Sequence, residues 1–160
     1  MSVILPKEVI RLLKSKDTKK VLATVDKNGI PNVAFKDSVD VNEDGNIEVT
    51  EFLETSRTNK NLTYSLWFDK TVAVSVWDET GAAYELKGIP VKVHISGPLF
   101  EQKYKEYLAI DPINDISGVW VIKPTEVRNQ TYAERKKEQD EKYPIIGHLD
   151  KDRRTDDKIS

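Results

Sequence analysis

Apolar and polar positions along the first forty residues predict one helix and two strands. A helix is expected near residues 5–15, because Pro6 suits a first helical position and apolar residues recur behind it at helical spacing. Lys20–Asp26 is apolar and β-branched, and the turn signal Asp26–Gly29 ends it. In Pro31–Val41 the apolar residues occupy odd positions, which predicts one half-buried strand.

The middle of the chain continues the strand pattern and contains a change of phase. Ile47–Phe52 follows the turn signal NEDGN, and Lys70–Asp78 is a strand of alternating valines. Ala82–Gly97 is predicted to be a long strand in which the apolar positions switch from even to odd at Gly88. A slip of one residue at a glycine indicates a β-bulge, which bends a strand as a barrel requires.

Two more helices and a final strand complete the domain. Helical spacing predicts helices at 56–66 and 98–110, and Gly118–Ile122 reads as a last core strand. Some six antiparallel strands interrupted by short helices predict a small, mainly β barrel over residues 1–130. A charged helix and tail are expected over residues 131–160.

Composition narrows the functional classes. The chain has 160 residues, about one domain, and its 27 acidic and 25 basic residues give a net charge of −2. This balance argues against a nucleic-acid binder held by bulk charge. No apolar run approaches the ~18 residues of a membrane helix, so no membrane partner is expected.

Cysteine is absent and there are two histidines, so disulfides, thiol catalysis and a multi-histidine metal site are not expected. A cytoplasmic protein fits these facts.

Candidate chemistry is concentrated where a strand is followed by a helix, in Thr50–Leu62. Hydroxyl and cationic residues gather at the predicted helix start, namely Thr55, Ser56, Arg57, Thr58 and Lys60. Free N–H groups at a helix N-terminus favour anions, and arginine matches phosphate oxygens with two donors. A phosphate site is one interpretation. A simple helix cap with solvated cations is the other, and the residues alone leave both open.

The segment Pro31–Ser38 is a second candidate, because its polar face carries Asn32, Lys36 and Ser38. The backbone of such a strand can place N–H and C=O groups at the edge of a flat ring. Lys36 could then supply positive charge beside a reduced flavin, which carries negative charge at its N1/O2 edge. The alternative is an ordinary surface lysine.

The order of elements, with the pieces LATVDKNGIPNV and TSRTNKNL, resembles the pyridoxamine 5′-phosphate oxidase-like family of FMN-binding proteins. The resemblance spans about residues 5 to 125. It implies a mainly β fold, a six-stranded antiparallel split β-barrel with a few short α-helices. It also implies a homodimer with FMN bound in a groove at the subunit interface.

The resemblance carries a set of FMN contacts onto this chain. By position they are Val33, Ala34, Phe35, Lys36, Thr50, Glu51, Ser56, Arg57, Thr58 and Ala83. The family's phosphate-binding Ser-Arg-Lys falls on 56–58, so Thr58 stands where the family has lysine. Lys60, two positions on, is the candidate substitute.

Two departures from the family's true oxidase argue against pyridoxamine phosphate as the substrate. No arginine opens the strand Pro31–Lys36, and the tail has Arg153 and Arg154 without a nearby tryptophan. The resemblance therefore implies an FMN-dependent oxidoreductase acting on an unidentified small acceptor. No catalytic residue is named, because the flavin itself accepts and donates the electrons and a protein acid or base is not required. The alternative is a non-catalytic carrier of FMN or haem.

Two other features have competing interpretations. Asp40–Glu51 matches the twelve-residue EF-hand loop pattern, but an EF-hand needs a flanking helix on each side. Period-two alternation on both sides predicts a β-hairpin instead, so a calcium site is not expected. His94 falls on the polar side of its strand, which favours a surface or interface histidine over a haem ligand.

Overall fold

The structure, a computed structural model, describes residues 3–144. Its helices are α1 (Lys7–Lys14), α2 (Arg57–Phe68), α3 (Pro98–Ile110) and α4 (Tyr132–Lys142). Its strands are β1 (Lys19–Val25), β2 (Pro31–Phe35), β3 (Asp40–Val41), β4 (Ile47–Glu51), β5 (Val72–Trp77), β6 (Ala83–His94) and β7 (Gly118–Asn129). The predicted helices near 5–15, 56–66 and 98–110 are therefore confirmed.

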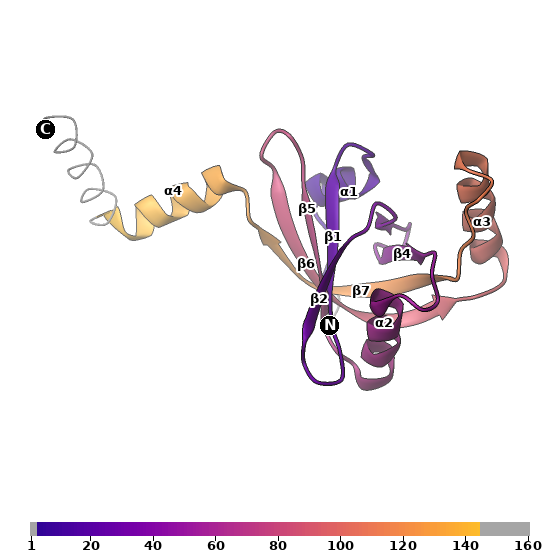
Figure 1. Cartoon of the computed structure of the whole chain (residues 1–160). Coiled ribbons are helices and arrows are strands. Elements are labelled where there is room, and N and C mark those ends of the chain that lie inside the picture. The colour runs from indigo at the N-terminus through magenta and orange to yellow at the C-terminus, as the bar shows by residue number, and fades with distance from the viewer. Residues whose placement is uncertain (1–2, 145–160) are drawn as a thin grey trace, which may run out of the picture.

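The seven strands form one antiparallel sheet with the order β2-β1-β5-β6-β7-β4-β3. The sheet is strongly curled, as in a half-barrel, and α2 lies beside the turn that joins β1 to β2 (Figure 1). β2 and β3 follow each other in the chain but stand at opposite edges of the sheet. The mainly β split-barrel fold is consistent with this sheet, but the predicted count of six strands is wrong.

The extra strand arises because Pro31–Val41 is not one strand, as the alternation predicted. The chain turns after β2, with the N–H of Val39 donating to the carbonyl of Lys36 at 3.1 Å, and then pairs with β4 as β3. The turn also changes which face is buried. Val39 is fully buried, whereas Val33 and Phe35 are 66% and 78% exposed. The prediction that these odd positions share one buried face is correct only after the turn.

The predicted bulge at Gly88 is confirmed. The pairing of β6 with β7 shifts register between Lys87 and Gly88, and again between Pro90 and Lys92. β7 continues to Asn129, beyond the predicted end at Ile122. Proline cannot donate to a strand ladder, but Pro124 lies opposite Gly88, where the ladder is already interrupted. Gly88 and Pro124 therefore lie at the same interruption of the hydrogen-bond ladder, and β7 continues beyond it.

The core lies inside the curled sheet and under α1. One stripe of α1 is buried, formed by Val9, Leu12 and Leu13, as helical spacing requires. These side chains pack in one cluster with strand residues that include Leu22, Ile47, Val74, Leu86 and Ile122. This continuous core positions the ends of β4 and α2, where the candidate site lies.

The helix α4 extends away from the barrel (Figure 1), and none of its residues is buried. It is held by pairs along its own surface, such as Lys136 with Asp140 and Lys142 with Glu138, both at 2.6 Å. The predicted tail beyond it, residues 145–160, lies outside the described residues. Between residues 3 and 144, no helix is long and apolar enough to cross a bilayer.

Candidate functional site

The start of α2 presents donors for an anion. Ser56 is the N-cap, and its Oγ accepts from the N–H of Asn59 at 2.9 Å. The N–H groups of Arg57 and Thr58 precede the first intrahelical bond and have no acceptor within the helix. The first turn contains no acidic residue, so the positive end of the helix dipole is not neutralised there.

One face of α2 lines a pocket of about 660 Å³ together with the β1–β2 turn. The helix contributes residues at positions i, i+3, i+4 and i+7, which are Arg57, Lys60, Asn61 and Tyr64. The turn contributes Asp26, Lys27 and Asn28, and Thr55 completes the lining. The pocket size is typical of cofactor sites.

The pocket is cationic even though it contains an aspartate. The Oδ1 atom of Asp26 accepts from the N–H groups of Asn28 and Ile30, at 2.8 and 2.9 Å, and so holds the turn together. The side chains of Arg57, Lys60 and Lys27 supply three positive groups against that one carboxylate. The charge of the pocket therefore suits a phosphate group, and Arg57, which lines the pocket, is also the first residue of α2.

The structure separates Ser56 and Thr58 from the other predicted phosphate contacts, because neither of them lines the pocket. Thr58 is 4% exposed and is not among the residues that line the pocket. Lys60 lies with Arg57 in the pocket lining, which is compatible with the prediction that it substitutes for the family's lysine. Whether these residues bind a cofactor stays a prediction.

Three other predicted contacts meet at a buried ion pair beside the helix start. The side chain of Glu51 is 1% exposed, and its Oε1 lies 2.8 Å from the Nζ of Lys36. Its other oxygen, Oε2, accepts from the hydroxyl of Ser56 at 3.1 Å. Lys36 thus points to the barrel interior and is not an ordinary surface lysine.

Thr50 is also buried, one residue before this ion pair. Its carbonyl accepts from the hydroxyl of Ser38 at 2.7 Å. Burial raises the pKa of Tyr107, and the Thr50 side chain acts in the opposite direction. The side chain of Thr50 supports the barrel at this point and is not open to a ligand.

The predicted flavin-contacting strand β2 has one free edge, since its other edge pairs with β1. The N–H of Lys36 donates to the carbonyl of Lys20 at 3.0 Å, so even-numbered residues bond to β1. Antiparallel pairing alternates, and the N–H and C=O groups of Val33 and Phe35 therefore face the free edge. Ala34, between them, is half-buried.

Ala83 is not brought to this site within one chain. It pairs with Trp77, which in turn pairs with Lys19, so it lies where β1 begins. The cationic pocket lies at the other end of β1, beside Asp26. A contact from Ala83 to a cofactor in this pocket would require a second copy of the chain.

Several pocket residues were not predicted from the sequence. In the sequence, Lys27 and Asn28 are only parts of a turn, and Asn61 and Tyr64 are only parts of a helix. The spacing of Asn61 and Tyr64 from Arg57 was the available signal, because it places all three on one helix face. Nothing in the spacing indicated that the β1–β2 turn would lie against that face.

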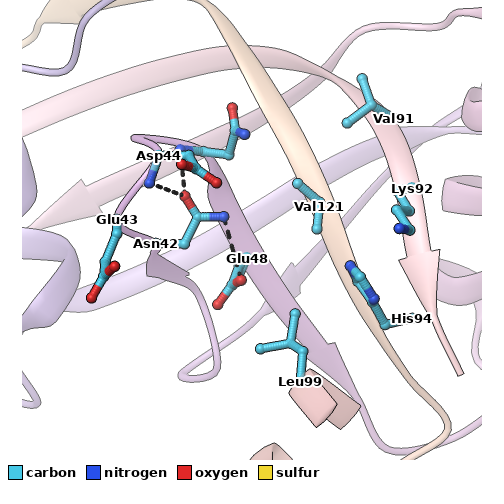
Figure 2. A pocket seen from close by; sticks show the side chains of 10 residues that line it. Asn42, Glu43, Asp44, Glu48, Val91, Lys92, His94, Leu99 and Val121 are labelled. Carbon is cyan, nitrogen blue, oxygen red and sulfur yellow. Dashed lines mark hydrogen bonds between the residues drawn. The ribbon is translucent and has the colours of Figure 1, made fainter. Parts of the chain in front are cut away.

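The loop with the EF-hand pattern is a hairpin between β3 and β4, as predicted (Figure 2). Asn42 Oδ1 accepts from the N–H groups of Asp44 and Asn46, at 3.0 Å each, and shapes the turn. Its amide donates to Glu48 at 3.4 Å. The twelfth position of the pattern, Glu51, is buried against Lys36 and cannot coordinate an ion in this loop.

A second pocket, of about 420 Å³, lies between this hairpin and β6. Figure 2 shows the side chains that line it. Glu43, Asp44 and Glu48 line one side, and Lys92 and His94 line the other. Within residues 3–144 no three histidine, aspartate or glutamate side chains are grouped so that they could hold a metal ion. His94 is partly exposed.

Solved structures share this fold. HupZ from Group A Streptococcus is 18% identical, with a TM-score of 0.66 over 81% of this chain and 96% of HupZ. An FMN-binding protein from Syntrophomonas wolfei is 16% identical, with a TM-score of 0.61 over 78% of this chain and 87% of that one. HutZ, the heme storage protein of Vibrio cholerae, is 19% identical, with a TM-score of 0.56 over 79% and 95%.

The chain therefore has the fold of the pyridoxamine 5′-phosphate oxidase-like, FMN-binding split-barrel proteins, as the sequence resemblance predicted. Proteins assigned as pyridoxamine 5′-phosphate oxidases, from Lactobacillus delbrueckii and Listeria innocua, share it at 23% and 15% identity. At such identities the likeness establishes the fold. No family model and no curated protein sequence matches the chain.

Proposed function

We propose that this chain binds FMN and acts as an FMN-dependent oxidoreductase on a small acceptor. The observation that carries the proposal is the cationic pocket at the start of α2, where Arg57 and Lys60 stand beside free N–H groups of the helix. The phosphate is the part of FMN that such a pocket recognises. Bound FMN would supply the hydride or electron transfer.

The chain's own residues bind and orient the cofactor in this proposal. Arg57 and Lys60 hold the phosphate, and Lys27 adds positive charge from the facing turn. The free edge of β2 offers the N–H and C=O groups of Val33 and Phe35 to the edge of the ring. Strand donors of this kind fix the ring's orientation without any side-chain acid or base.

A homodimer with FMN at the subunit interface is part of the proposal. Val33 and Phe35 expose large apolar side chains on an edge strand, a combination that monomeric proteins usually avoid. Trp67 and Ile95 are also more than two-thirds exposed, at 77% and 70%. A second copy would cover such surface and could bring its Ala83 toward the cofactor.

The absorbance spectrum of the purified protein is the first test. A yellow protein with the bands of bound flavin supports the proposal. Arg57→Ala should then weaken FMN far more than riboflavin, because riboflavin lacks the phosphate, and Arg135→Ala on α4 is a matched control that should leave both unchanged. Equal losses of FMN and riboflavin in Arg57→Ala would contradict the phosphate assignment.

The competing function is a carrier without turnover, of FMN or of haem. The fold of HutZ supports it, as does His94, which lines a pocket with the apolar residues Val91, Leu99 and Val121. A Soret band in the purified protein would favour haem. For a yellow protein, anaerobic mixing with NADH or NADPH separates the two roles, because an oxidoreductase bleaches its flavin and passes the electrons to an added acceptor.

A further inference from the structure

We propose that Glu51 is a positioning residue for the phosphate pocket, and that Lys36 strengthens phosphate binding by neutralising Glu51. This inference rests on the proposed FMN binding. The family resemblance places both side chains among the cofactor contacts, and the structure gives them a different task. Their contacts join the end of β4, the start of α2 and the segment after β2.

Burial and bonding prevent Glu51 from touching a ligand. Its side chain is 1% exposed. Oε2 accepts from Ser56, and Oε1 makes no hydrogen bond but is paired in charge with Lys36 Nζ at 2.8 Å. Ser117 closes the backbone side, since its N–H and its hydroxyl both bond the Glu51 carbonyl, at 2.8 and 3.1 Å. Glu51 does not line the pocket, so a cofactor bound there would not meet its carboxylate.

The carboxylate determines what Ser56 can do. The hydroxyl of Ser56 has one proton, which it donates to Glu51 Oε2, while its oxygen accepts from the N–H of Asn59. That proton is therefore not directed to a phosphate. Ser56 fixes the helix start, and the phosphate is left to Arg57, Lys60 and the free N–H groups. This differs from the direct phosphate contact that the resemblance implies for Ser56.

The charge of the carboxylate explains the need for Lys36. Glu51 is bonded to Ser56, which lies in the chain between the pocket residues Thr55 and Arg57. A buried negative charge there repels a phosphate and is poorly screened by water. Lys36 Nζ, 2.8 Å from Oε1 and itself 17% exposed, cancels that charge within the barrel. The pair thus keeps the pocket's positive field intact while Glu51 holds Ser56 in place.

The test compares FMN and riboflavin affinities in four variants, because the ratio of the two affinities isolates the contribution of the phosphate. Lys36→Met leaves the carboxylate without its cation, and the preference for FMN should fall roughly tenfold. Glu51→Gln removes the charge while its amide oxygen still accepts from Ser56, so the preference should stay or rise. The double variant, with neither charge, should return to the wild-type ratio. Lys36→Arg, which keeps the charge, should change little.

These outcomes distinguish positioning from contact. If Glu51→Gln lowers the preference for FMN, or if the double variant stays as weak as Lys36→Met, the proposal is wrong. Thermal unfolding of the cofactor-free proteins provides a separate measurement, in which Lys36→Met should have the lowest melting temperature and the double variant should recover part of the loss. A wild type that binds no FMN refutes the proposed function and the effect on phosphate, and the melting temperatures then show whether the pair is coupled.

Discussion

Replacing Gly88 by alanine tests whether the bulge in β6 depends on the missing side chain. A Cβ at this position would lie 2.7 Å from the Cγ2 of Ile122 and 2.7 Å from the carbonyl oxygen of Lys123. Ordinary contacts begin at 3.4 Å, so the two strands would have to separate by several tenths of an ångström. One of the two clashing atoms belongs to the backbone and cannot rotate away.

The expected loss follows from this geometry. Overpacking of a tight core costs about 1–3 kcal/mol, and alanine returns about 0.4–1 kcal/mol by restricting the unfolded chain. Gly88→Ala should therefore lower the free energy of unfolding by about 1–2 kcal/mol. The φ angle of Gly88 lies outside the left-handed region, so the loss would come from crowding and not from backbone strain.

Urea unfolding followed by tryptophan fluorescence measures this loss, since Trp120 is 2% exposed in the core. Gly118→Ala is the matched control on the same strand pair. Its Cβ would meet the Cγ2 of Val93 at 3.0 Å, and a side chain can move, so stability should change by less than about 1 kcal/mol. The reasoning is refuted if Gly88→Ala is as stable as the wild type, or if Gly118→Ala loses more.

Three further predictions concern other contacts. Burial lowers the pKa of Lys20, so the folded chain holds this proton less tightly than the unfolded chain. Folding stability should therefore rise with pH as pH approaches 10.5, and urea unfolding at several pH values should show less of this rise in Lys20→Met. Phe35→Ser should shift the protein toward monomer in analytical ultracentrifugation, because it removes a 78% exposed apolar side chain from the proposed interface; an unchanged mass would count against that interface. Trp120→Phe should cost about 1 kcal/mol in urea unfolding by removing the 2.9 Å bond from Trp120 Nε1 to Asn59 Oδ1, whereas no loss would show that the bond is not stabilising.

Local patterns predicted the elements whose burial follows from their own spacing. α1 follows from its apolar stripe, and the bulge follows from the change of phase at Gly88. Alternation failed for Pro31–Val41 because exposed Val33 and Phe35 look the same in sequence as buried Val39. What differs is the partner strand, which the pattern of one segment cannot identify.

The candidate site was predicted only as far as short-range geometry allowed. Hydroxyl and cationic residues at a helix start are visible in sequence, and the structure places Arg57 and Lys60 in a pocket. The bond from Ser56 to Glu51 spans five residues across a change from strand to helix, and the ion pair with Lys36 spans fifteen. Such contacts depend on how the sheet curls, and residue spacing does not contain that information.

The short link between β2 and β3 has a consequence for how the barrel assembles. It joins the two edge strands of the sheet, and three side-chain contacts hold it in place. Lys20 donates to the carbonyl of Val39, Ser38 donates to the carbonyl of Thr50, and Lys36 forms an ion pair with Glu51. A loop this short adds little closure entropy, so the margins meet without a long crossover. A single proteolytic cut in this link would remove the covalent connection between the two edge strands while leaving every core side chain in the protein.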